Sequence, residues 1–135
     1  MEINKVNNDK LIKTFIEFVL NEKEETLGQI ANEIKESHFI TPAYLLEGEH
    51  YNFIAFGSEN NTFRIPVFSN EEEYIKGYNY LKLDEKEEDY TPLVVSSELF
   101  ISLAENDESF NGIVLDIHDG KYVIAKDILK LASEE

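Results

Sequence analysis

The stretch TFRIPVFSNEEE, residues 62–73, predicts a strand that passes directly into a helix. Every second residue from Phe63 to Val67 is apolar, so these residues share one face of a strand that we expect over residues 62–68. Ser69 and Glu72 have the spacing of a capping box, and the three consecutive glutamates lie where the helix dipole favours negative charge. The pattern therefore indicates a β-strand, a turn at Ser69 and an α-helix.

Two further helices are predicted before this strand, in the segment 8–37. Apolar residues recur at helical spacing after Asn8 or Asp9, either of which can cap the first helix, and again between Glu24 and Glu36. The expected buried residues are Leu11, Ile12, Phe15, Ile16 and Val19 in the first helix and Leu27, Ile30, Ala31 and Ile34 in the second.

Residues 39–56 show the pattern of β-strands. Phe39–Leu46 contains Pro42, which cannot donate to a strand ladder, so we expect either an edge strand or an irregular beginning there. Tyr51–Phe56 is the next expected strand, followed by a polar loop at 57–61. With the strand at 62–68, this predicts an antiparallel meander of three strands.

The C-terminal half alternates between the two patterns. The helix after Ser69 is expected to bury Tyr74, Ile75 and Tyr78, and a helix capped by Ser96 or Ser97 is expected to bury Leu99, Phe100 and Leu103. Strands are expected at Thr91–Val95, Gly112–Ile117 and Tyr122–Ala125, the last two joined by an Asp119-Gly120 hairpin turn, before a final helix capped by Asp127.

The resulting order, ααβββαβαββα, predicts an α+β fold. We expect a mixed, mainly antiparallel sheet of about five to six strands with helices packed on it. The length of 135 residues suits a single domain, with a helical segment at 8–37 and an α+β core at 38–132.

Composition argues against several partners and chemistries. The chain has 12 Lys and Arg against 28 Asp and Glu, a formal net charge of −16, and Arg64 is its only arginine. Such a charge repels phosphate backbones and anionic membranes, so we expect no nucleic-acid and no membrane partner. The absence of cysteine excludes disulfides, thiolate nucleophiles and cysteine-based zinc sites. No secretory signal and no membrane-length apolar run is present, which predicts a cytoplasmic protein.

Several segments resemble the SseB N-terminal domain family, named for an enhanced serine sensitivity phenotype. In that family a strand ending in Pro-Val-Phe meets Ser or Thr and an acidic helix start, as in residues 63–73 here. The resemblance continues in Leu93-Val94-Val95, in Asn111–Leu115 and in Tyr122-Val123-Ile124, and spans Phe39–Ala132. Larger members have a second, C-terminal domain. The resemblance implies no catalytic residue, because the family has no catalytic motif.

Asp116 and His118 form the most chemically suggestive pair. On the predicted strand they point to the same face, about 7 Å apart. Imidazole and carboxylate can ligate a divalent metal, but a site needs three or four ligands. A solvated face beside the hairpin is therefore the preferred interpretation, with a metal-dependent hydrolase using this pair as the alternative. Nucleophile-elbow, P-loop and dinucleotide motifs are missing, so we predict no catalytic residue, no metal and no cofactor.

The segment between Ser69 and Tyr90 is the predicted binding surface. Its tyrosines suit an interface and its acidic residues suit a basic partner, although half-buried core tyrosines are the preferred interpretation of the rings. The predicted binding residues are Glu72, Tyr74, Tyr78, Tyr80, Glu87 and Asp89. The sequence thus predicts a non-enzymatic interaction or regulatory module with an unidentified protein partner. An acidic inhibitor or immunity-type protein that masks a basic surface is the alternative.

Overall fold

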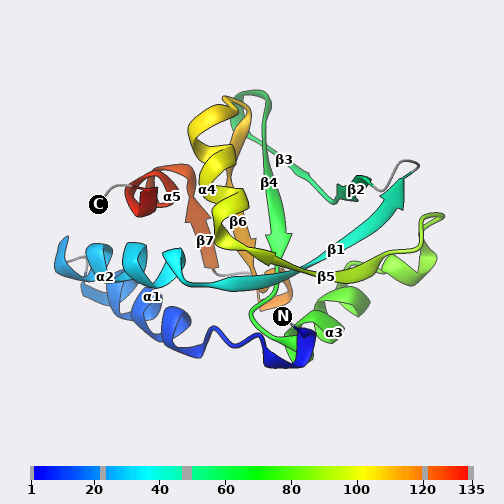
Figure 1. Ribbon diagram of the computed structural model, residues 1–135, viewed down its shortest axis with the longest axis horizontal. Coiled ribbons are helices and arrows are strands. Elements are labelled where there is room, and N and C mark those ends of the chain that lie inside the picture. Colours follow the sequence, from blue (N-terminus) through cyan, green and yellow to red (C-terminus); the bar gives the residue numbers. More distant parts are fainter. Residues whose placement is uncertain (1, 22–23, 47–49, 120–121, 134–135) are drawn as a thin grey trace.

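A computed structural model describes residues 2–21, 24–46, 50–119 and 122–133. These residues contain five α-helices and seven strands, and the strands form two sheets (Figure 1). This architecture confirms the predicted α+β class, and the order of elements matches apart from one additional short strand, β3 (Phe56–Ser58). It differs from the expected single sheet because the strands are divided between sheets of three and four strands.

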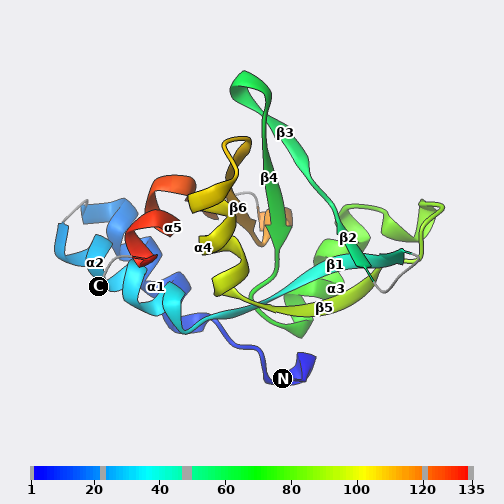
Figure 2. The ribbon, with the colours of Figure 1, turned by 45° about the horizontal axis from the view of Figure 1, so that its top comes forward.

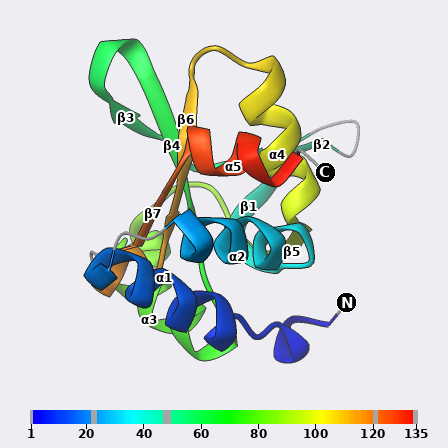
Figure 3. The same cartoon turned by 90° about the vertical axis from the view of Figure 1, so that its left-hand side faces the viewer.

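The N-terminal helices pack with the C-terminal helix. α1 (Asp9–Asn21) and α2 (Glu24–Lys35) lie side by side, and α2 also contacts α5 (Lys126–Ser133) (Figure 3). Two residues predicted to be buried, Ile16 and Val19, are 41% and 58% exposed, so the buried face of α1 is narrower than its apolar pattern predicts. Among the described residues, the apolar side chains that these two helices do bury are Leu11, Phe15, Ile30, Ala31 and Ile34.

The first sheet has three antiparallel strands in the order β2-β1-β5. They are β1 (His38–Leu46), β2 (His50–Phe53) and β5 (Thr91–Ser96). Since β1 lies in the centre, the prediction that it is an edge strand is wrong.

Pro42 is accommodated in this central strand because of the direction in which its nitrogen points. The backbone N–H and C=O of Ile40 bond to Phe68 and not to β5. Because strand residues alternate with a period of two, the nitrogen of Pro42 also faces away from β5. Pairing with β2 begins only at Ala43, so Pro42 removes no bond from either ladder.

The second sheet has four strands in the order β3-β4-β6-β7. β4 (Thr62–Val67) and β6 (Phe110–Leu115) are parallel, whereas β3 pairs with β4 and β7 (Tyr122–Ala125) with β6 in antiparallel fashion. β3 takes the last residue of the predicted strand, Phe56, and two residues predicted to be loop, and it belongs to a different sheet from β2, which corrects the predicted meander. Together β3 and the start of β4 project from the rest of the molecule (Figure 2).

The two sheets meet where β1 passes the end of β4. Ile40 and Phe68 exchange both backbone hydrogen bonds there, with N···O distances of 3.1 and 2.7 Å. Neighbouring residues of β1 face different cores. Phe39 packs into the main core between the sheets and the helices, and Ile40 packs into a second core with Val6, Phe68 and Tyr74. Residues 39–43 of β1 are therefore buried on both faces of the strand, whereas its last two residues are exposed.

α3 (Glu71–Tyr80) covers the second core, but its N-cap differs from the prediction by one residue. The side chain of Asn70, not that of Ser69, accepts the hydrogen bond from the backbone N–H of Glu73, at 2.8 Å. Ser69 is buried, and its hydroxyl donates instead to the carboxylate of Asp116 at 2.7 Å.

Gly77 sets the face of α3 that is buried. A Cβ atom at this position would lie 2.0 Å from the ring of Phe68, so only glycine lets the helix approach this closely. Tyr74 is buried on the same side, whereas Ile75, which was predicted to be buried, is 55% exposed.

The last two helices cover the main core. α4 (Ser97–Asn106) is capped by the side chain of Ser96, one of the two predicted caps, and buries Phe100, while Leu99 is 37% exposed and not buried as predicted. α5 begins at Lys126, so its predicted cap, Asp127, lies within the first turn. Within the part of the chain that the structure describes, no helix has the length and apolar character to span a membrane.

Candidate functional site

Polar side chains converge where β4 and β6 end. Because these two strands are parallel, with Val67 opposite Leu115, the residues that follow them lie at the same edge of the sheet. After β4 come Ser69 and the first turn of α3, and after β6 come Asp116 and a short 3-10 helix, Ile117–Asp119.

Asp116 is buried and bonded, which corrects the prediction that it lies on a solvated strand face. It is 2% exposed and its carboxylate accepts hydrogen bonds from the backbone N–H of Ser69, at 2.9 Å, and from the Ser69 hydroxyl, at 2.7 Å. Burial raises the pKa of Asp116, against the opposing effect of these bonds from Ser69. Its φ of 54° ends the strand, so Asp116 and His118 do not share a strand face.

His118 is held between α3 and the second core. Its Nε2 lies 2.5 Å from Oε2 of Glu73, and its ring stacks on Phe68 with a centroid separation of 5.9 Å. The side chain is 9% exposed, and its other ring nitrogen, Nδ1, has no hydrogen-bond partner among the described residues. His118 is therefore not solvated either, and its partner is a glutamate 45 residues away.

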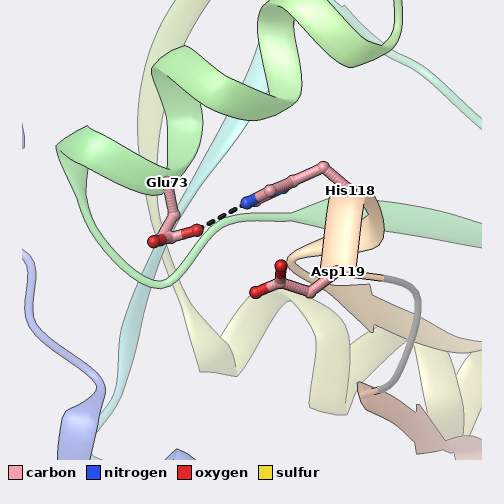
Figure 4. A group of neighbouring side chains, drawn as sticks. All are labelled: Glu73, His118 and Asp119. Atoms are coloured by element: carbon pink, nitrogen blue, oxygen red, sulfur yellow. Dashed lines mark hydrogen bonds and ion pairs between the residues drawn. The ribbon is translucent and has the colours of Figure 1, made fainter.

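Glu73, His118 and Asp119 form a cluster in which one nitrogen or oxygen atom of each lies within 4.8 Å of the others (Figure 4). Burial acts to raise the pKa of Glu73, but hydrogen bonds from His118 and Lys76 and the charges of these two residues lower it overall. The Nζ atom of Lys76 lies 3.4 Å from Oε1 of Glu73. The cluster can exchange protons or bind a cation.

The structure separates the six predicted binding residues. Tyr74 is buried, which raises its pKa, and its hydroxyl has no hydrogen-bond partner among the described residues. Tyr78 is half-buried beside it, with ring centroids 6.1 Å apart. Tyr80 is 59% exposed, but two residues along a helix turn it about 200° away from Tyr78. The remaining three, Glu72, Glu87 and Asp89, are exposed.

An aromatic surface forms around Tyr90, a residue that marked the end of the predicted binding segment but was not among the predicted binding residues. Tyr90 contacts Tyr44 edge to face, with centroids 5.2 Å apart, and borders a depression of about 270 Å³ that Tyr78 and Pro92 also line. A second depression, of about 480 Å³, lies between Tyr44 and Asp89. We call this the Tyr90 surface and define it by Tyr44, Tyr51, Ile75, Tyr78, Tyr90 and Pro92.

The sequence contains only an indirect signal for this surface. Tyr44 and Tyr90 meet because β1 and β5 pair with Ala43 opposite Thr91, and this pairing joins residues almost 50 positions apart. The Glu73–His118 contact depends in the same way on the parallel pairing of β4 and β6. The Asp119-Gly120 hairpin turn lies partly outside the described residues.

Comparisons with known proteins found no match, whether to a protein-family model, to a curated protein or to a solved structure. The resemblance to SseB N-terminal domains accordingly stays a prediction.

Proposed function

We propose that the protein is a non-enzymatic binding module that recognises a basic protein through the Tyr90 surface. The observation behind this proposal is the combination of accessible apolar groups with an acidic border. Ile75 is 55% exposed, Pro92 is exposed, and Tyr78 and Tyr90 are each half-buried around one depression. Aromatic rings held in this way supply large contact area at little cost in side-chain entropy.

Acidic residues border the Tyr90 surface on two sides. Glu87, Glu88 and Asp89 are exposed directly before Tyr90, and the negative charge of Glu88, after burial, is a cause of the raised pKa of Tyr90. Glu71 and Glu72 lie one helical turn before Ile75. With a net charge of −16, the molecule attracts a basic partner, and its charges increase the association rate more than the final affinity.

The interior position of Ser69 and Asp116 supports a non-enzymatic role. The Ser69 hydroxyl and the Asp116 carboxylate bind each other, and the two residues are 1% and 2% exposed, so other described residues cover them from solvent and from a substrate. Both proposals, a regulatory module and an inhibitor or immunity-type protein, use the same surface. They differ in what the partner does when it is free.

The test is to capture partners from the native cell with the immobilised protein at low and high salt, and to measure the identified pair by surface plasmon resonance. Ile75→Asp places a charge at the centre of the surface and is expected to accelerate dissociation about tenfold or more. Replacing the acids at 87–89 by their amides is expected to slow association and flatten its salt dependence.

Tyr80→Ala is the matched control. It removes a large side chain that is about as exposed as Ile75, at 59% against 55%, but lies on another side of α3. We expect it to bind like the wild type. Loss of binding in this variant with normal binding by Ile75→Asp would move the surface to the other side of the helix. Turnover of a substrate that depends on Asp116 or His118 would contradict the non-enzymatic role.

A further inference from the structure

The geometry points to a divalent transition-metal site formed by Glu73, His118 and Asp119, a site independent of the proposed partner surface. Glu73 comes from the first turn of α3, and the other two residues come from the 3-10 helix after β6 (Figure 4). These two segments are fixed to each other by the buried bonds between Asp116 and Ser69. The three side chains are therefore positioned before any ion binds, as a metal site requires.

His118 distinguishes this cluster from a group of surface acids. Its ring is nine-tenths buried, it is held against Phe68, and it is directed at the carboxylate of Glu73 (Figure 4). Nδ1 has no partner among the described residues, so the bonding capacity of the buried ring is not satisfied by this part of the chain. Without a metal, an Nε2–H group donates to the carboxylate of Glu73, and a cation that replaces this proton is bound by the imidazole nitrogen and the carboxylate oxygen together.

The surrounding charge also favours a cation. The carboxylate of Glu72 lies close to the cluster, since it shares Lys76 with Glu73, at N···O distances of 3.8 and 3.4 Å. Lys76 is a competing cation, with a side chain that is 55% exposed and free to turn toward solvent. A dication that displaces Lys76 from Glu73 brings two positive charges to the cluster in place of one.

The donor set selects the kind of metal. One imidazole nitrogen and two carboxylate oxygens suit Zn²⁺ and related first-row dications with water as a further ligand, whereas Mg²⁺ and Ca²⁺ prefer oxygen donors alone. Metal bonds of about 2.0–2.2 Å set adjacent donors about 3 Å apart. The 2.5 Å pair of Nε2 and Oε2 thus separates slightly on binding, which the 20% exposed side chain of Glu73 permits.

The test is calorimetric titration of the metal-free protein with Zn²⁺, in parallel with Mg²⁺. We expect one equivalent of Zn²⁺ to bind, no comparable Mg²⁺ binding, and a shift of the His118 imidazole NMR signals at the same stoichiometry. Asp119→Asn changes an exposed residue and is expected to weaken binding about tenfold or more. His118→Phe keeps a ring against Phe68 and is expected to abolish binding while the protein remains folded.

Two variants and one control sharpen the result. Lys76→Met removes the competing cation and is expected to strengthen Zn²⁺ binding, an effect that a merely structural role of Glu73 does not produce. Glu72→Gln removes the neighbouring, exposed carboxylate and is expected to change affinity far less than Glu73→Gln. His50→Ala removes an exposed histidine elsewhere and is expected to have no effect.

Three outcomes would overturn the assignment. They are the absence of saturable Zn²⁺ binding to the wild type, full binding by folded His118→Phe, and loss of binding in His50→Ala.

Discussion

Asp116 determines how two segments of the chain are joined, through a single side chain. Its left-handed backbone conformation, with φ of 54°, ends β6, and its carboxylate binds both the N–H and the hydroxyl of Ser69 just before α3. Among residues other than glycine, Asp and Asn adopt this conformation most readily. Asp116 therefore does two things: it adopts the left-handed conformation that ends β6, and it accepts the hydrogen bonds of the buried residue before α3.

Asp116→Ala is accordingly expected to lower the free energy of unfolding by about 2–4 kcal/mol, measured by urea denaturation. Two buried donors of Ser69 lose their acceptor, and alanine resists positive φ. Asp116→Asn retains one acceptor oxygen and tolerates the turn, so we expect a smaller loss. The exposed Asp119→Asn is the control, with a change of about 0.5 kcal/mol or less. Equal stability of the Asn and Ala variants would contradict this account.

The sequence pattern points to Asp116 and His118 but does not predict what surrounds them. The two residues stand out as possible ligands because a carboxylate and an imidazole lie two positions apart. The strand was predicted to extend to Ile117, which placed both side chains on one solvent-exposed face. Aspartate in a left-handed conformation resembles any other aspartate in sequence, so the end of β6 at Leu115 was not foreseeable. The N-cap of α3 was predicted one residue too early for a related reason. Ser69 with Glu72 and Asn70 with Glu73 have the same spacing, and adjacent polar residues can each begin a helix.

At the scale of elements, α3 shows how a neighbouring ring overrides helical periodicity. The pattern of apolar residues placed Ile75 inward, but the Phe68 ring lies against Gly77, and the helix packs along its smallest residue. Alternation and turn residues were sufficient for most strands and for all five helices. They were not sufficient for β3, whose three residues, Phe56–Ser58, contain a glycine and a serine.

Two glycines inside helices give a matched pair of opposite predictions. At Gly77 an added Cβ would lie 2.0 Å from Phe68, whereas at Gly28 in α2 it would meet no atom of the described residues within 4 Å outside the neighbouring backbone of its own helix. Gly77→Ala is expected to destabilise the protein by about 1–3 kcal/mol through overpacking. Gly28→Ala is expected to stabilise it by about 0.5–1 kcal/mol through helix propensity. Thermal melts of both variants test this, and a stabilised Gly77→Ala would show that α3 does not pack on Phe68.

At the scale of the whole molecule, the pairing of strands was the least predictable feature. β4 pairs with β6 across nearly 50 residues, and β1 pairs with β5 over a similar separation. Local patterns of apolar residues predict that a strand exists, but they do not predict which strand it pairs with. The division into two sheets, the central position of β1 and the Tyr90 surface all follow from these pairings.

The net charge of −16 predicts that moderate salt stabilises the fold. Like charges repel one another in the compact state, and raising NaCl from about 20 mM to about 200 mM shortens the screening length to less than about 10 Å. We expect Tm to rise by several degrees over this range, with most of the gain at the low end. A matched series with sucrose separates screening from solvent exclusion. A Tm that falls with NaCl would show that attractive ion pairs outweigh the repulsion.

The second core has a consequence for how the molecule comes apart. It is small, consisting among the described residues of Val6, Ile40, Phe68 and Tyr74 with half-buried neighbours, and it lies on the opposite face of β1 from the main core. The main core is complete without α3, since its residues come from the other helices and the sheets. We therefore expect α3 to open as a separate unit at a lower free energy than the whole molecule, since it is held mainly by the contacts around Phe68 and by the Glu73–His118 pair.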